Sequence, residues 1–106
     1  MGKFNGKAVL ITGGSTGIGL ATELSPRGIR VNVVNPGFID TPIFETSGVP
    51  EEGRAAIRKM VAGMAKVGRI CRPEDIAGAV LYLASPESAY VIGAEIITDG
   101  GYSIIT

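Results

Sequence analysis

The sequence predicts an α/β protein with a parallel sheet of about three strands and two to three helices. Three observations lead to this prediction. An unbroken apolar run, Lys7–Thr12, is typical of a strand buried on both faces of a parallel sheet. A glycine-rich turn and a short helical stretch follow it, and then comes a β-branched alternating stretch, Ile29–Asn35. The residues between the two strands suffice for a crossover, so this part reads as a β-α-β unit.

The first helix is expected from Ile18 to about Leu24. Ser25 and Pro26 would end it, and Gly28 supports a stop there. Pro36 and Gly37 end the second strand, and a polar loop is expected from there to Pro50.

A second helix is expected from Glu51 to about Lys66. Two glutamates in its first turn face the positive end of the helix dipole. Apolar side chains recur at steps of three and four, which places them on one face. We expect this face to pack in the core; its members are Ile57, Met60, Val61 and Met64.

The last helix and strand are expected at Pro73–Ala84 and Ala94–Thr98. Proline is favoured in the first turn of a helix, and Glu74 and Asp75 follow it there. The apolar residues of this helix spread over more than one face, so it must bury two sides. Asp99 and two glycines close the final strand.

The composition limits the classes of function. The chain has 106 residues, of which 45% are hydrophobic and 19% charged, and this predicts a single globular domain over 1–106. Ten basic and ten acidic residues balance, so neither nucleic acid nor a membrane is expected as a partner. Cys71 is the only cysteine and histidine is absent, which argues against a disulfide or a Cys/His metal site. No signal peptide is recognised, and a cytoplasmic location is expected.

The glycine-rich turn Gly13–Gly19 has the setting of a phosphate-binding loop. It lies between a strand and a helix, where amide N–H groups and the helix dipole attract an anion. Its spacing is GxxxGxG, whereas the commonest dinucleotide fingerprint is GxGxxG. A tight turn without a ligand would explain the same pattern.

Four stretches follow one another along most of the chain: GKAVLITGGSTGIG, RGIRVNVVNPGFIDTPI, GRICRPEDIAGAVLYLAS and VIGAEIITDGGYS. In this order they resemble the short-chain dehydrogenase/reductase family. The resemblance implies a reduced Rossmann-like fold and a nicotinamide cofactor, NAD or NADP. It also implies that the last helix and strand build subunit contacts, and we expect a homo-oligomer, most simply a dimer.

The resemblance assigns cofactor contacts to ten residues. Those in the glycine-rich turn would cradle the diphosphate, and those after the second strand would border the nicotinamide. The ten are Gly13, Ser15, Thr16, Gly17, Ile18, Gly19, Pro36, Gly37, Ile39 and Thr41. The stretch Glu51–Val67 would belong to the substrate lobe.

Members of this family are more than twice as long as this chain. Thr22–Leu24 joins the start of the family's first helix to the end of a much later one, so the domain reads as truncated from within. The absent part would carry the selector for the adenosine ribose, the catalytic serine and the Tyr-x-x-x-Lys pair. None of the three tyrosines here, Tyr82, Tyr90 and Tyr102, has a lysine four residues on. We therefore expect no catalytic residue, and weak or no redox activity.

Two functions compete at this point. The chain binds a nicotinamide dinucleotide or another phosphate-containing ligand, weakly, through the glycine-rich turn. Alternatively, it is a structural or interaction protein that pairs with itself or with full-length relatives, or a deletion product without a function.

The truncation also has a geometric consequence. Removing two intervening strands would bring the Pro36–Thr41 loop roughly 10 Å closer to the glycine-rich turn, because strands lie about 4.8 Å apart.

Overall fold

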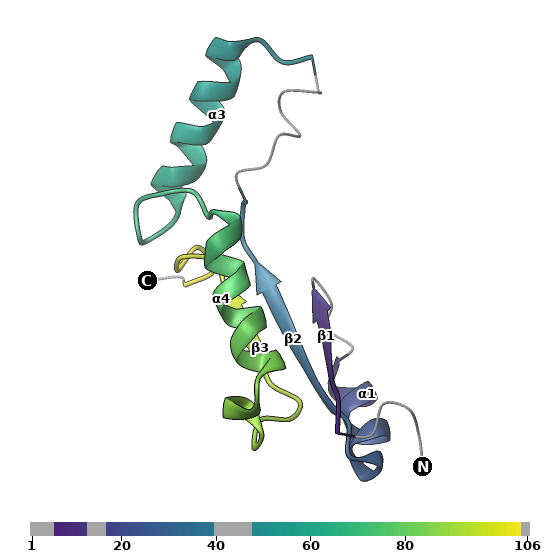
Figure 1. Ribbon diagram of the computed structural model, residues 1–106. Coiled ribbons are helices and arrows are strands. Elements are labelled where there is room, and N and C mark those ends of the chain that lie inside the picture. The colour runs from purple at the N-terminus through teal and green to yellow at the C-terminus, as the bar shows by residue number, and fades with distance from the viewer. Residues whose placement is uncertain (1–5, 13–16, 40–47, 105–106) are drawn as a thin grey trace.

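The computed structural model describes residues 6–12, 17–39 and 48–104 (Figure 1). Within them, three strands and three α-helices follow one another in the order β1, α1, β2, α3, α4, β3, with short 3-10 turns after α1 and α4. The molecule is elongated, with principal extents of 55 × 34 × 22 Å. The α/β class expected from the sequence is confirmed.

The sheet is parallel throughout and has the order β1-β2-β3. Its strands are β1 (Ala8–Thr12), β2 (Arg30–Pro36) and β3 (Glu95–Thr98). β2 lies in the middle, and its residues 31–34 are buried, which suits the three valines among them. The strand order, which the sequence left open, makes β1 a direct neighbour of β2.

Helix α1 (Gly17–Leu24) covers one face of the sheet. Ala21 of this helix packs with Ile29 and Val31 in a buried cluster. A 3-10 turn, Ser25–Arg27, ends the helix, and Gly28 then takes φ 74°, a conformation that glycine adopts without strain. These turns reverse the chain into β2, as the stop signals in the sequence indicate.

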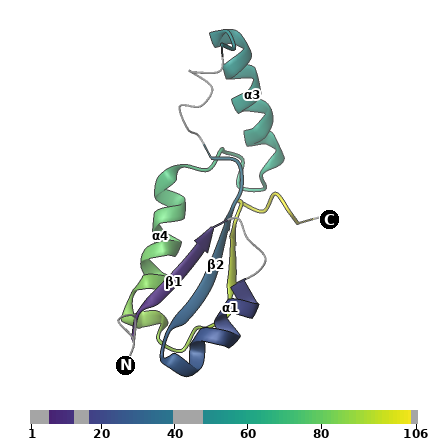
Figure 2. The same ribbon diagram turned by 90° about the vertical axis from the view of Figure 1, so that its right-hand side faces the viewer.

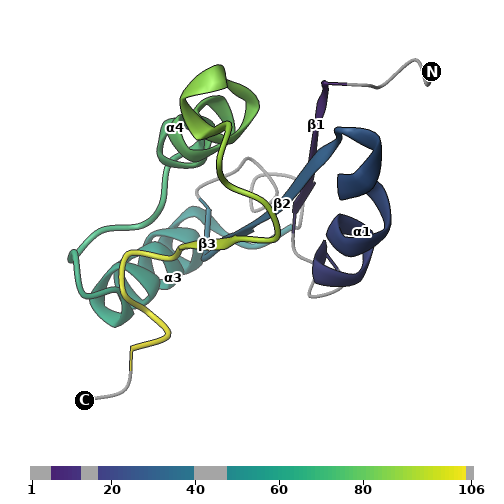
Figure 3. The ribbon, with the colours of Figure 1, turned by 90° about the horizontal axis from the view of Figure 1, so that it is seen from below.

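Helix α4 (Pro73–Ala84) lies on the opposite side of the sheet (Figure 3). Leu83 is fully buried, whereas Leu81 is 69% exposed. A second 3-10 turn, Pro86–Ser88, follows the helix. The bounds of α4 agree with the sequence expectation, but the described residues bury only one of its two apolar sides.

Helix α3 (Glu51–Met64) stands beyond the carboxyl ends of the strands instead of over the sheet (Figures 1 and 2). The expectation that its apolar face joins the core was therefore wrong for two of the four side chains named for that face. Val61 is buried, but Met60 is 61% and Met64 is 42% exposed. Helical spacing aligns apolar residues on one face without stating what covers that face. The helix also ends two residues before the expected Lys66.

Candidate functional site

The glycine-rich turn connects the carboxyl end of β1 to the first residue of α1. Gly13, Ser15 and Thr16, three of the residues predicted to bind the cofactor, lie outside the described residues. The residues on either side of the turn are described. Thr12 ends β1 and pairs with Val34 of β2, and Gly17 begins α1. The turn is thus attached at the edge of the sheet where parallel strands end, which is the usual ligand-binding edge of such sheets.

Gly17 packs directly against the sheet. A Cβ built on this residue would lie 2.2 Å from Cγ2 of Val33 and 3.8 Å from Cδ1 of Ile11. Only a residue without a side chain allows α1 to begin this close to β2. Gly17 therefore has a packing role, the one that the last glycine of a dinucleotide-binding turn commonly has.

Ile18 and Gly19 have a different environment from Gly17. Ile18 is 66% exposed, and a Cβ built on Gly19 would meet no atom within 4 Å. The first turn of α1 thus presents backbone and one apolar side chain to open space. Such a surface allows close approach of a ligand to the backbone, and diphosphate binding here stays a prediction.

Pro36, Gly37 and Ile39, predicted to border the nicotinamide, follow β2 at the same edge. Pro36 is paired with Thr98, and the Gly37 N–H donates to the Thr98 carbonyl oxygen over 3.2 Å. Ile39 forms an isolated parallel bridge with Cys71. Thr41, the last residue predicted to bind the cofactor, lies outside the described residues.

Gly37 also packs closely on the neighbouring turn. A Cβ built on it would lie 2.9 Å from Cα of Asp99. The backbone from Pro36 to Ile39 is therefore tied to β3 and to the segment before α4. In the described part of the chain these contacts are made with β3, with the turn after it and with the segment before α4, and the nicotinamide contacts stay a prediction.

The direct pairing of β1 with β2 sets the spacing of the two predicted subsites. Adjacent strands lie about 4.8 Å apart, so the glycine-rich turn and the segment after β2 leave the sheet from neighbouring strands. From the sequence, the two segments are expected to approach one another because β1 and β2 would be neighbours. The strand order β1-β2-β3 makes them neighbours.

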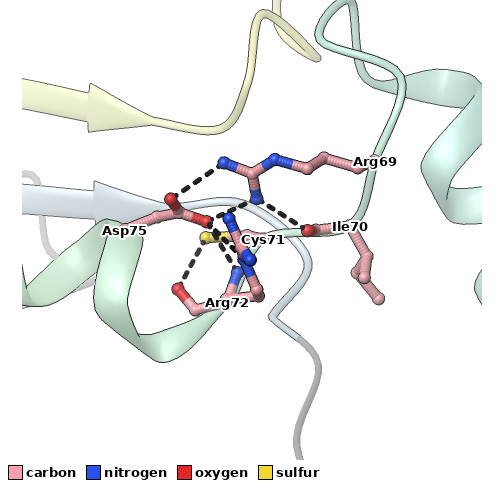
Figure 4. Close-up of polar contacts among 5 residues, drawn as sticks. All are labelled: Arg69, Ile70, Cys71, Arg72 and Asp75. Carbon is pink, nitrogen blue, oxygen red and sulfur yellow. Dashed lines mark hydrogen bonds and ion pairs between the residues drawn. The ribbon is translucent and has the colours of Figure 1, made fainter.

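A group of polar contacts that sequence reasoning missed lies just before and in the first turn of α4 (Figure 4). The Arg69 guanidinium donates to both carboxylate oxygens of Asp75, over 2.7 and 2.9 Å. The Arg72 N–H donates to the same carboxylate over 2.9 Å. A helical first-turn aspartate preceded by two arginines was the signal that could have revealed it.

The electrostatics of this group follow from these contacts. The hydrogen bond from Arg69, together with that from the Arg72 N–H, holds the pKa of Asp75 well below its usual range. The same ion pair raises the pKa of Arg69. Burial raises the pKa of the neighbouring Cys71 thiol. The directions of these pKa shifts indicate that Arg69 and Asp75 form an ion pair and that the Cys71 thiol stays neutral. Cys71 is therefore not an activated nucleophile.

Membrane spans and metal sites are two other features to consider in the part of the chain that the structure describes. None of the helices found there has the length and apolarity needed to cross a membrane. Within the same part of the chain, no three His, Cys, Asp or Glu residues are grouped so that they could hold a metal ion.

A family model described as Enoyl-(Acyl carrier protein) reductase matches residues 15–103. A solved short-chain dehydrogenase/reductase of Caenorhabditis elegans superposes with a TM-score of 0.74 at 32% identity, and the match covers 85% of this chain. The chain belongs to the short-chain dehydrogenase/reductase family. Members of this family bind nicotinamide dinucleotides, and the solved relative was crystallised with a cofactor, as its description says.

Two curated relatives of the same family give the extent of the similarity. Cis-4-hydroxycyclohexanecarboxylate dehydrogenase of Sinomonas cyclohexanicum is 40% identical over 85 residues, which are 80% of this chain and 32% of the relative. A 3-oxoacyl-(acyl-carrier-protein) reductase of Thermotoga maritima is 45% identical over 84 residues, which are 79% of this chain and 32% of the relative. The match to the C. elegans structure covers 35% of that chain. This chain thus spans about a third of the length of these relatives.

Proposed function

We propose that this chain binds a nicotinamide dinucleotide, or another phosphate-containing ligand, weakly and has weak or no redox activity. The observation that carries the proposal is the start of α1. Gly17 seats the helix against Val33, and Gly19, two residues further along α1, has open space beside its backbone. A diphosphate placed there would meet helix N–H groups and the positive end of the helix dipole.

We expect weak or no redox activity because of the acid/base chemistry that carbonyl reduction requires. A tyrosine that donates a proton near neutral pH needs its pKa of about 10 lowered, and a nearby lysine does this in the family. No tyrosine of this sequence has a lysine four residues on. Acid/base catalysis typically raises a reaction rate about 10² to 10⁴-fold. Without it, the chain should reduce ketones or aldehydes far more slowly than an ordinary enzyme does.

Titration with NADH, followed by nicotinamide fluorescence, tests the proposal. Saturable binding is expected, and Gly19→Glu should abolish it because the added carboxylate would face the diphosphate in open space. Gly63→Glu is the matched control, since a Cβ at Gly63 of α3 also meets nothing within 4 Å. Binding that is absent, or that both variants weaken equally, would contradict the proposal.

A second candidate, self-association, is favoured by specific exposed side chains. Leu81 of α4 and Ile97 of β3 are both more than half exposed, and Tyr90 beyond α4 is fully exposed. Soluble monomers rarely leave large apolar patches in water, and an unpaired strand edge invites a further strand. In this second proposal the α4 and β3 side of the molecule forms an isologous contact with a second copy.

A further inference from the structure

A pocket of about 170 Å³ lies where four segments meet beyond the carboxyl ends of β2 and β3. The segments are the end of β2, the end of α3, residues 65–75 and the turn after β3. Apolar or aromatic side chains and one thiol make up more than half of its wall: Phe38, Val61, Ala65, Val67, Ile70, Cys71 and Tyr102. Arg69, Asp75 and Asp99 add charged groups to the wall. None of the residues predicted to bind the cofactor is among the residues that line it.

Backbone contacts hold the walls of this pocket in place. The Val67 N–H donates to the Gly100 carbonyl oxygen over 3.1 Å, and the Cys71 N–H donates to the Phe38 carbonyl oxygen over the same distance. Gly100 has φ +62°, and a Cβ built on it would lie 2.8 Å from Cγ2 of Val67. The connection between α3 and α4 is thus fixed to both neighbouring strands, which makes the pocket pre-formed.

The charged groups beside the pocket already have partners. Asp75 accepts two hydrogen bonds from Arg69 and one from the Arg72 N–H (Figure 4). Asp99 accepts from the N–H groups of Gly101 and Ser103, each over 2.9 Å. Among the described residues, no buried side-chain nitrogen or oxygen lacks a hydrogen-bond partner. Of the wall residues that the structure describes, the one cation, Arg69, is already paired with Asp75, and the carboxylates of Asp75 and Asp99 would repel an anion. The hydrogen bonds that Asp99 accepts already stabilise its charge, so the pocket favours an uncharged ligand.

Two aromatic rings from distant parts of the sequence meet at the pocket. The centroids of Phe38 and Tyr102 lie 5.3 Å apart, with the ring planes at 87°. The charge distribution of aromatic rings favours this edge-to-face arrangement. The ring of a bound ligand could pack against the pair in the same way. The thiol of Cys71 adds a polarisable contact.

We propose that this pocket binds a compact, uncharged ligand with one six-membered aromatic ring, such as a phenol. An apolar cavity of about 150 Å³ accommodates benzene, so the volume suits a ring of this size and excludes a fused bicyclic one. The proposal does not rest on cofactor binding, because the pocket and the start of α1 have no residue in common.

Titration of the full chain with phenol, followed by methyl NMR, tests this proposal. The methyl signals of Val61, Val67 and Ile70 should shift in a saturable manner, with a dissociation constant of roughly 1 mM, as expected for so few heavy atoms. Benzoate and 2-naphthol should bind at least about tenfold more weakly, because one is charged and the other too large. Shifts that spread over the whole surface, or equal affinity for benzoate, would overturn the proposal.

Three variants locate the binding. Val61→Phe fills the pocket and should weaken phenol binding at least about tenfold, whereas Met60→Phe, at the exposed neighbouring position, should leave it unchanged. Tyr102→Ala, at a partly exposed position, enlarges the pocket and should improve binding of 2-naphthol while weakening that of phenol. A locally unfolded pocket could not gain affinity for 2-naphthol. A gain for 2-naphthol together with a loss for phenol therefore shows that the change in pocket size, and not misfolding, alters the binding. Phenol binding that is unchanged in a folded Val61→Phe, or a Tyr102→Ala without the exchange, would disprove the assignment.

Discussion

Arg30 donates hydrogen bonds of 2.9 Å to both the carbonyl oxygen and the hydroxyl oxygen of Ser88. The same guanidinium donates to the carbonyl oxygens of Leu83 and Ser85, each over 3.2 Å. These acceptors belong to the last turn of α4 and to the residues after it, whose carbonyl groups lack partners within the helix. One side chain of β2 thereby fixes the carboxyl end of α4 to the sheet.

Replacing this arginine should therefore loosen α4. We expect Arg30→Met to lower the free energy of unfolding by about 1.5–3 kcal/mol, the range for hydrogen bonds to a charged group. Arg30→Lys should recover only part of this loss, because an ammonium cannot reach all four acceptors from one position. Urea unfolding measures both, with Arg27→Met at an exposed position as the control. An Arg30→Met protein as stable as this control would contradict the assigned role.

Two glycines of α1 should respond in opposite directions to alanine. Gly17→Ala should cost about 1–3 kcal/mol, since the new methyl group would overlap Val33. Gly19→Ala should stabilise by up to about 1 kcal/mol, because alanine is the better helix former and the space is open. Thermal unfolding of both proteins checks the sign. Val33→Ala should cost less stability in the Gly17→Ala background than in the wild type, and equal costs in the two backgrounds would contradict the overlap.

The Arg69–Asp75 ion pair should make stability depend on acid. The folded pKa of Asp75 is lowered, so its contribution is fully present above the unfolded value of about 4 and is lost as the pH falls toward the folded value. Asp75→Asn should thus be less stable than the wild type at pH 7, and the difference should narrow at pH 3. Urea midpoints at both pH values measure this, with Glu74→Gln in the same helical turn as the control. A difference of equal size at both pH values would argue against the ion pair.

Cofactor binding should barely distinguish NADPH from NADH. The resemblance implies that the segment by which the family selects the adenosine ribose is absent from this chain, and each lost hydrogen bond to a charged group weakens binding by roughly ten- to a hundredfold. We expect two weak dissociation constants that agree within about threefold. Parallel fluorescence titrations of the two cofactors are the measurement. Tight binding with a strong preference for either one would refute this expectation.

Self-association through α4 should depend on Leu81. We expect a dimer at micromolar concentration, with a melting temperature that rises with protein concentration because folding is coupled to assembly. Leu81→Glu should give a monomer whose melting temperature is independent of concentration, since it places a charge on an apolar, 69% exposed position. Light scattering and thermal scans test this, with Lys59→Glu on α3 as the control. A folded wild-type monomer would exclude the dimer.

Local patterns in the sequence were sufficient to predict the secondary structure. The apolar run before the glycine-rich turn, the proline at the start of α4 and the stop at Gly28 each depend on backbone preferences of a few residues. The strands and helices of the structure agree with these predictions to within two residues.

The parts that the sequence could not predict depend on contacts between distant residues. The exposure of Met60 depends on where α3 lies relative to the sheet, which its own periodicity does not contain. The hydrogen bonds of Arg30 and the meeting of Phe38 with Tyr102 likewise join residues far apart in the chain. For the predicted cofactor site, the sequence indicated the edge of the sheet, and it could not show that Gly17 packs against Val33.

The order of strands in the sheet also bears on how the chain folds. β1 and β2 are separated by one short helix, so their pairing closes a small loop at little entropic cost. β2 and β3 come together across a long segment; Asn32, for example, accepts a hydrogen bond from the N–H of Ala94, 62 residues away. Contacts between sequence neighbours form faster than distant ones. The β1-α1-β2 unit should therefore assemble first, and the docking of α4 and β3 onto its open side should set the overall folding rate.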